Sequence, residues 1–241
     1  MVEILTDDQK EYVSKNYGNI KAPQIAEYLG VSINSVYNYA KKIKLSKQLN
    51  PKFDITPRLE QIILGGILGD GSFKKNGSNY YYRECHAIPE ADYLRWKYHE
   101  FGNMTTGKLY DIPARGENQN PQIGMQTVNT PSLRPYAMMD SMTAIAKLDE
   151  LGILIWLLDD GWIRRNSKVC SYGVSAASFS DEEIFAIIEK LAEHGLSAHT
   201  VGKKNDLSLT SVNNSRIKEI AYKYLPKEMD IVVKKINDLH G

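Results

Sequence analysis

Two segments of the chain are almost wholly apolar, and each ends at an aspartate followed by a glycine. They span residues 62–71 and 151–161. A run of this length without a polar face is typical of a helix that is buried on every side. We expect the closing glycine of each run to take the left-handed conformation that ends a helix. Asp70 and Asp160 then lie at the negative ends of two helix dipoles, where a carboxylate is disfavoured unless a cation is close.

The sequence around these segments repeats once, with a period of about 85–90 residues. The sequence SFKKN follows the first run and WIRRN follows the second, and both predict the start of a strand and a turn. Strand-like stretches at 80–86 and 171–178 come next, and then helices with acidic starts. This order predicts an α+β domain that is duplicated about a pseudo-twofold axis, with the pattern αββαββα and antiparallel hairpins in each half. We expect the halves at 58–145 and 146–241.

Residues 6–45 carry the spacing of three short helices. Thr6 is suited to cap the first helix, Pro23 begins the second, and Ser32 caps the third after a glycine turn. This pattern predicts a small all-α helix-turn-helix domain at 1–47, followed by a linker at 48–57. A three-helix packing module has the same spacing and stays an alternative. The apolar face of the third helix is expected to contain Ile33, Val36, Ala40 and Ile43, and its DNA face Asn34, Tyr37, Asn38, Lys41 and Lys42.

Composition adds little about the partner. The net charge is only +1 over 241 residues, so a basic surface has to be local. Cys85 and Cys170 form neither a disulfide framework nor a zinc site by themselves. The first residues do not resemble a signal peptide, and the apolar runs are too short to cross a bilayer. We expect a cytoplasmic protein with no membrane partner, of bacterial or phage rather than organellar origin.

The two aspartates predict a paired site if the apolar helices pack side by side. Gly65, Gly66 and Gly69 allow the two backbones to approach closely, so that Asp70 and Asp160 come together at one end of the helices. Two carboxylates about 4 Å apart repel by about 4 kcal/mol at an effective dielectric of about 20. Such a pair is therefore expected to bind a cation.

Mg²⁺ is the expected cofactor, with Mn²⁺ as a substitute, because the ligands available are all oxygens. The main-chain carbonyls of Gly69 and Asp159 are expected to add to the two carboxylates. Two acids related by a twofold axis suit duplex DNA, which offers one scissile phosphate on each strand. The metal would activate water and stabilise charge on the phosphate.

These residues resemble the two LAGLIDADG motifs of monomeric homing endonucleases. The motifs fall at 63–71 and 153–161, and the second is similar to the W-x-M-D-D-G variant of that family. The resemblance covers residues 58–241. It implies two saddle-shaped antiparallel sheets over the major groove, and it assigns the metal-holding acids to Asp70 and Asp160. Leu68 replaces the first acid of the motif, and Ile155 stands where relatives have a small residue, which predicts looser helix packing.

The family also places a basic residue near each site to support the water network. We expect Lys234 to have this role in one half and Lys147 in the other, although Lys234 equally fits a surface lysine. The histidines show no metal-ligand spacing and receive no role. The expected DNA contacts on strands and hairpin tips are Lys74, Lys75, Arg83, Lys108, Arg115, Arg164, Arg165, Lys203 and Lys204.

The sequence therefore predicts a monomeric, site-specific DNA endonuclease that makes metal-dependent double-strand breaks at a long asymmetric target. Two alternatives share the fold. One is a transcriptional regulator that binds DNA and has lost cleavage, and the other is an RNA splicing maturase. Retention of both Asp70 and Asp160 argues against the regulator, because a site that binds no metal has no reason to keep two repelling acids. A nuclease that also splices has the same sequence features.

Overall fold

The computed structural model describes residues 5–17, 20–45, 51–114, 120–165, 170–202, 206–237 and 239. The chain separates into two compact units. The small unit is Met1–Phe53 with Asn129–Pro131, and the large unit is Asp54–Val128 with Ser132–Gly241. Within the described residues, no helix has the length and apolar character that a membrane span requires.

The small unit contains helices α1 (Asp7–Asn16), α2 (Ala22–Leu29) and α3 (Ile33–Lys42). The hydroxyl of Thr6 accepts a hydrogen bond from the Gln9 amide, and the hydroxyl of Ser32 accepts one from the Ser35 amide. Gly30 ends α2 with a φ of 64°, the left-handed conformation that lets the chain turn directly into α3. The three predicted helices are therefore present with their predicted N-terminal caps. A helix-turn-helix function for them stays a prediction.

Apolar side chains from all three helices meet in a core that belongs to the small unit alone. Val13, Ile25 and Val36 are fully buried there. The expectation that Ile43 joins this core is wrong, because α3 ends at Lys42 and the Ile43 side chain is 40% exposed. Of the residues expected to face DNA, Asn34, Asn38, Lys41 and Lys42 are exposed, whereas Tyr37 is half-buried and packs against the core.

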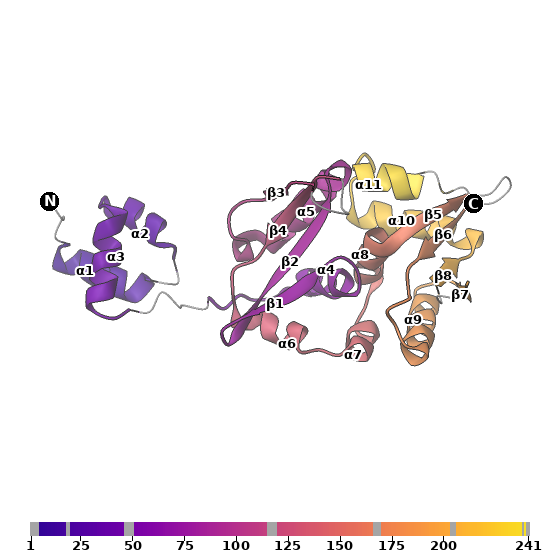
Figure 1. Ribbon diagram of the computed structural model, residues 1–241, viewed down its shortest axis with the longest axis horizontal. Helices are drawn as coiled ribbons and strands as arrows, with labels where there is room; N and C mark the ends of the chain where they lie inside the picture. The colour runs from indigo at the N-terminus through magenta and orange to yellow at the C-terminus, as the bar shows by residue number, and fades with distance from the viewer. Residues whose placement is uncertain are drawn as a thin grey trace. The chain divides into compact units, whose positions relative to one another are not determined.

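The large unit contains two halves with the same order of elements (Figure 1). The first half consists of α4 (Pro57–Leu68), β1 (Ser72–Asn76), β2 (Asn79–Ala87), α5 (Ala91–Phe101), β3 (Tyr110–Ile112), β4 (Gln122–Gln126), α6 (Arg134–Ala137) and α7 (Ser141–Ala146). The second half consists of α8 (Glu150–Asp160), β5 (Gly161–Arg165), β6 (Cys170–Val174), α9 (Asp181–Glu193), β7 (Ala198–Val201), β8 (Asp206–Leu209) and α10 (Asn214–Tyr224). Helix α11 (Asp230–Val232) and a π-helical turn at Val233–Asn237 follow.

Each half builds one four-stranded antiparallel sheet, in the order β1-β2-β4-β3 and β5-β6-β8-β7. Phe73 pairs with Tyr82 in the first sheet, and Ile163 pairs with Tyr172 in the second, 90 positions later. The duplicated α+β fold predicted from the repeat is confirmed. Strand β6 ends at Val174, earlier than the stretch predicted at 171–178, because residues 177–178 form a turn.

Helices α4 and α8 pack against each other in the centre of the large unit, with one sheet on either side (Figure 1). A Cβ atom on Gly65 would lie 2.7 Å from the Ile155 Cβ, and one on Gly69 would lie 2.5 Å from the Asp159 Cβ. Only glycine allows these approaches. Ile155 is fully buried and occupies the space that Gly65 leaves, so the prediction of looser packing at this position is wrong.

The glycines that close the two motifs do not adopt the predicted left-handed conformation. Gly161 has a φ of −91° in extended backbone, and Gly71 is not among the residues of positive φ. Both glycines instead lie under a tyrosine of the following hairpin. A Cβ on Gly71 would lie 2.6 Å from Cζ of Tyr82, and one on Gly161 would lie 2.8 Å from Cζ of Tyr172. Gly66, expected at the helix crossing, also faces Tyr82.

Candidate active site

Asp70 lies just beyond the end of α4, and its side chain is 41% exposed. Burial of the rest of the carboxyl and the negative charge of Asp159 raise the pKa of Asp70 to about 7, although the charge of His86 opposes the rise. A carboxyl that titrates near neutral pH among other acids favours a nearby cation.

Asp160 is the last residue of α8, and it is half-buried. Burial and the charge of Asp159 raise the pKa of Asp160 to about 6, while the ammonium group of Lys235 opposes the rise. Partial burial and the charge of Asp159 therefore act on both motif acids. The same two causes raise the pKa of both predicted acids, although different positive side chains oppose the rise.

Asp159 itself contacts a buried lysine of the first half. The side chains of Asp159, Lys97 and Glu84 are all 0% exposed. Lys97 Nζ donates to Asp159 Oδ1 at 2.8 Å and Oδ2 at 2.9 Å, and to Glu84 Oε1 at 2.5 Å. The Tyr93 hydroxyl donates to Asp159 Oδ1 at 2.9 Å. Burial lowers the pKa of Lys97, but the charges of Asp159 and Glu84 outweigh burial and raise it. One buried cation thus joins a carboxylate from each half.

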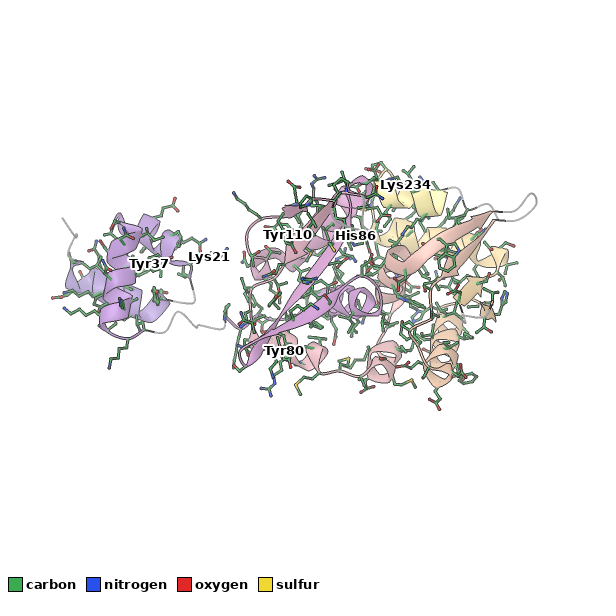
Figure 2. All side chains as sticks on the ribbon, viewed as in Figure 1. Lys21, Tyr37, Tyr80, His86, Tyr110 and Lys234 are labelled. Atoms are coloured by element: carbon green, nitrogen blue, oxygen red, sulfur yellow. The ribbon has the colours of Figure 1, made fainter. Side chains whose placement is uncertain are left out.

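His86, to which the sequence assigns no role, lies on strand β2 (Figure 2). Its side chain lies beside Asp70. Its Nδ1 is 3.5 Å from Asp70 Oδ2 and 3.4 Å from Glu90 Oε2, and its Nε2 is 2.6 Å from Glu84 Oε1. Burial lowers the pKa of His86, but the hydrogen bonds to Glu84 and Glu90 outweigh burial and raise it to about 10. Without a metal, this imidazole is therefore positively charged at neutral pH.

The donors around Asp70 suit a divalent cation. Carboxylate oxygens of Asp70 and Asp159 and a ring nitrogen of His86 lie within 4.8 Å of one another. Burial and then the negative charge of Asp159 raise the pKa of Asp70 and of Asp160, and a bound cation would favour the ionised form of each. The residues present thus fit the metal that the resemblance implies. The predicted roles of the Gly69 and Asp159 carbonyls as metal ligands stay predictions.

Lys235, rather than the predicted Lys234, contacts the end of α8. The amine of Lys235 donates to the main-chain carbonyl of Leu158, and its charge acts on Asp160. The amine of Lys234 instead donates to the carbonyl of Pro89 at 2.9 Å. Of these two neighbours, Lys235 is therefore the one whose hydrogen bond lies next to a motif acid.

The lysine expected to support the first half lies far along the helix from its acid. Lys147 Nζ is 3.7 Å from Glu60 Oε1, in the first turn of α4. Asp70 follows the last turn of the same helix. The prediction that Lys147 serves this site is therefore wrong. The buried cations that act on Asp70 are His86 and, more weakly, Lys97.

Four of the basic residues expected to contact DNA are exposed in the first half: Lys74, Lys75, Arg83 and Lys108. Lys74 pairs with Tyr81, and Arg83 is two residues further along β2, so Lys74 and Arg83 share one face of the sheet. Lys75 pairs with the β2 residue that precedes Tyr81, so its side chain leaves the sheet from the opposite face. Strand register thus selects Lys74 and Arg83 as neighbours on the solvent face of this sheet.

The remaining basic residues of the expected DNA surface are not described. Arg115, Lys203 and Lys204 lie outside the described residues, and the side chains of Arg164 and Arg165 are not described although their backbone forms part of β5. Contacts of these five residues with DNA stay predictions.

Glu84, His86 and Lys97 are the site residues that sequence reasoning missed. Strand alternation places residues 84 and 86 on the same face as Tyr82, which is fully buried. In α5, Tyr93 and Lys97 are four residues apart and share one side of the helix. The sequence did contain a signal for this cluster: acidic and basic residues occur on a strand face and a helix face that must be buried. Buried charges have to be paired, so such residues are expected to contact one another.

The fold resembles that of a solved homing endonuclease, I-WcaI. The homing endonuclease I-WcaI bound to its DNA recognition sequence has a TM-score of 0.62 and 18% identity, over 84% of this chain and 94% of that chain. The complex of I-DmoI with DNA and Ca has a TM-score of 0.42 and 12% identity, over 69% of this chain and 90% of that chain. The likeness to I-WcaI shows that the two proteins share a fold.

No curated protein matches the chain. The family model described as the LAGLIDADG DNA endonuclease family matches residues 60–220. This range contains Asp70 and Asp160, both sheets and the buried cluster of Glu84, His86, Lys97 and Asp159. The match confirms the resemblance inferred from the two motifs. The chain belongs to the LAGLIDADG DNA endonuclease family.

Proposed function

We propose that the chain is a monomeric, site-specific endonuclease that cleaves both strands of a long, asymmetric DNA target with the help of a divalent metal. The observation that carries this proposal is the matched pair of acids at the ends of α4 and α8. Asp70 follows the buried motif helix α4, and Asp160 ends the buried motif helix α8. Burial and the negative charge of Asp159 raise the pKa of both acids. Two such acids in one chain provide one site for each strand of a duplex.

Asp70 and Asp160 would hold the metal, and the other charged groups would keep them ready to do so. What a bound divalent ion supplies is charge that stabilises the phosphate and lowers the pKa of a water molecule. Lys235 favours the ionised form of Asp160. Lys97 acts in the same direction on Asp70 and Asp159, because its positive charge opposes their protonation. Lys234 is kept as the alternative basic residue of the second half.

The solvent face of the first sheet would position the DNA. Lys74 and Arg83 are exposed on one face of that sheet, opposite the buried face that carries Glu84 and His86. Contacts from lysine and arginine to phosphates fix the register of a protein on a duplex, and contacts to base edges select the sequence. An antiparallel sheet with exposed basic side chains is able to make both kinds of contact.

The small unit would add affinity rather than chemistry. Helix α3 presents Asn34, Asn38, Lys41 and Lys42 to solvent, and the unit has a core of its own. We expect a chain without residues 1–50 to remain a folded nuclease, with weaker binding and a shorter protected DNA footprint. Footprints of equal length for both chains would contradict a DNA-binding role for this unit.

Cleavage of a randomised duplex library tests the proposed function. The full chain is incubated with the library in Mg²⁺ and, separately, in Ca²⁺, and both the cleaved and the bound molecules are sequenced. The proposal predicts that one long asymmetric sequence is enriched among the cleaved molecules in Mg²⁺ only. Enrichment among bound molecules without cleavage in either metal would contradict the nuclease and indicate a regulator.

A further inference from the structure

One motif acid has an imidazole beside it. Nδ1 of His86 lies 3.5 Å from Asp70 Oδ2, and Asp159 offers a carboxylate oxygen within 4.8 Å of both partners. Two ligands that share one ion, with bonds of about 2.1 Å and tetrahedral angles, lie about 3.4 Å apart. The nitrogen of His86 and the oxygen of Asp70 therefore already have the separation of two ligands of the same ion.

The other ring nitrogen of His86 is held as it is in metal-binding histidines. Nε2 lies 2.6 Å from Glu84 Oε1, and Glu84 is fixed in turn by Lys97 at 2.5 Å and by the hydroxyl of Tyr82. A histidine that binds a metal through one nitrogen usually donates its second N–H to a carboxylate, which fixes the tautomer and the ring orientation. Glu84 supplies that carboxylate from a fully buried position and leaves Nδ1 facing Asp70.

Asp159 has an oxygen that is able to join the same ion. Its Oδ1 accepts hydrogen bonds from Lys97 and Tyr93, and its Oδ2 accepts one from Lys97. Each carboxylate oxygen has two lone pairs, so Oδ2 is able to bind an ion while the bond to Lys97 persists. The facing residue is Gly69, on which a Cβ would lie only 3.0 Å from Oδ2. Because residue 69 is a glycine, no side chain from that position covers Oδ2.

The second half has no imidazole at the equivalent position. The residues that follow Glu84, His86 and Lys97 by 90 positions are apolar and buried: Val174, Ala176 and Ile187. The register of the two sheets supports this correspondence, because four of the five pairs of β5 with β6 lie 90 positions after a pair of β1 with β2. The two motif acids therefore have chemically different surroundings.

We propose that His86 Nδ1 is a metal ligand, together with Asp70 and Asp159, so that the first half holds a mixed nitrogen–oxygen site. Such a site favours first-row transition ions over Mg²⁺, because imidazole binds these ions well and Mg²⁺ prefers oxygen. The site at Asp160 binds its ion through oxygen alone. This inference rests on the proposed function only in taking the motif acids as metal sites. The competing state is an imidazolium ion that only pairs with Asp70 and Glu90.

Pulsed electron paramagnetic resonance of the DNA-free full chain distinguishes the two states. Mn²⁺ serves as the spin probe, and the chain is prepared once with natural histidine and once with ¹⁵N-labelled histidine. The proposal predicts a nitrogen coupling that changes with the label in the wild-type chain. His86→Gln removes Nδ1 and keeps a donor for Glu84, and it should abolish the coupling. His99→Gln, which replaces an exposed histidine of α5, is the control and should retain it.

Calorimetry with Co²⁺ and Mg²⁺ gives the second measurement. The affinity of the first site for Co²⁺ should fall at least about tenfold in His86→Gln, and that for Mg²⁺ less than about threefold. Absence of the labelled coupling in the wild-type chain would overturn the proposal, since that result needs no substitution. Equal Co²⁺ affinity in a folded His86→Gln chain would overturn it as well. Neither result bears on whether the chain cleaves DNA in Mg²⁺, so a failure of the proposed function is recognised separately.

Discussion

The two halves of the large unit keep one architecture and differ in what they bury. In both halves a tyrosine lies over the motif glycine, Tyr82 over Gly71 and Tyr172 over Gly161. The two hydroxyl groups have different partners. Tyr82 donates to the carboxylate of Glu84, whereas Tyr172 donates to a main-chain carbonyl of α8 at 2.7 Å. The contact between the tyrosine and the motif glycine is therefore present in both halves. Only in the first half does the tyrosine also bind a charged side chain.

This difference separates the requirements of the fold from those of the site. The second half shows that the sheet and its covering helix need no buried charge, because Val174, Ala176 and Ile187 fill the equivalent positions. The charged cluster of the first half is therefore not a requirement of the fold. It receives Asp159 from the second motif, so a carboxylate of the second half joins the charges of the first half.

The largest expected effect on stability comes from removing the cation of the buried cluster. Lys97→Met leaves Glu84 and Asp159 buried without their shared partner, and breaking a buried ion pair in this way costs about 3–5 kcal/mol. Ile187→Met, at the matched position of the second half, should cost less than about 1.5 kcal/mol. Urea unfolding measures both. Similar losses in the two variants would show that the buried charges of the first half do not distinguish it energetically.

The next effect concerns the lysine that serves the second half. Lys235→Met should reduce cleavage of one strand about 10- to 100-fold, because it removes the charge that favours ionised Asp160. Lys234→Met is the matched control, since its amine contacts the carbonyl of Pro89. Single-strand cleavage rates on a duplex labelled at each end measure the effect. A larger loss in Lys234→Met would restore the residue predicted from the sequence.

The pH dependence of stability should also differ between the halves. The pKa of His86 is raised from 6.5 to about 10 in the folded protein, so its stabilising contribution is complete below about pH 6.5 and is lost as the pH rises towards 10. The free energy of unfolding of the metal-free chain should therefore fall between pH 7 and 10. In His86→Gln the fall should be smaller, and parallel curves for the two chains would contradict the assignment. The residue of the second half that matches His86 is Ala176, which has no titratable group.

The smallest expected effect lies in the small unit, where charge and base recognition are separable. Replacing Lys41 and Lys42 with alanine should reduce the slope of log affinity against log salt by about 0.9 per phosphate contact, or about 1.8 if both make one. The preference among target sequences should barely change. Asn38→Ala should show the reverse, with about 1–3 kcal/mol less discrimination at one base pair. An unchanged slope in the lysine variant would assign these lysines to a solvated face.

Apolar patterning and the repeat were sufficient to predict the two motif helices, both hairpin sheets and the positions of Asp70 and Asp160 at the helix ends. Buried helices and paired strands follow from the chain's own periodicity, and the acids from their place at the ends of the runs. The role of the motif glycines was not predictable from local sequence. The choice between a left-handed turn and a close approach depends on Tyr82 and Tyr172, which lie 11 residues further along the chain.

The contact of Lys235 with α8 was not predictable from the sequence for a related reason. Neighbouring residues of a helix point about 100° apart, and the π-helical turn at Val233–Asn237 changes which of them faces α8. The buried cluster depends on pairing between elements, since Lys97, Glu84 and Asp159 come from α5, β2 and α8. The pairing of charges across a helix crossing depends on the tertiary structure, so the spacing of residues in the sequence does not predict it.

Strand-specific cleavage tests the assignment of one acid to each strand most directly. Asp70→Asn and Asp160→Asn are compared with the wild-type chain on a target duplex labelled separately on each strand, in Mg²⁺. Each amide removes a charge that holds the metal, so double-strand cleavage should be abolished in both variants while DNA binding is kept. Any residual nicking should fall on opposite strands in the two variants. Undiminished double-strand cleavage by either variant would contradict the assignment.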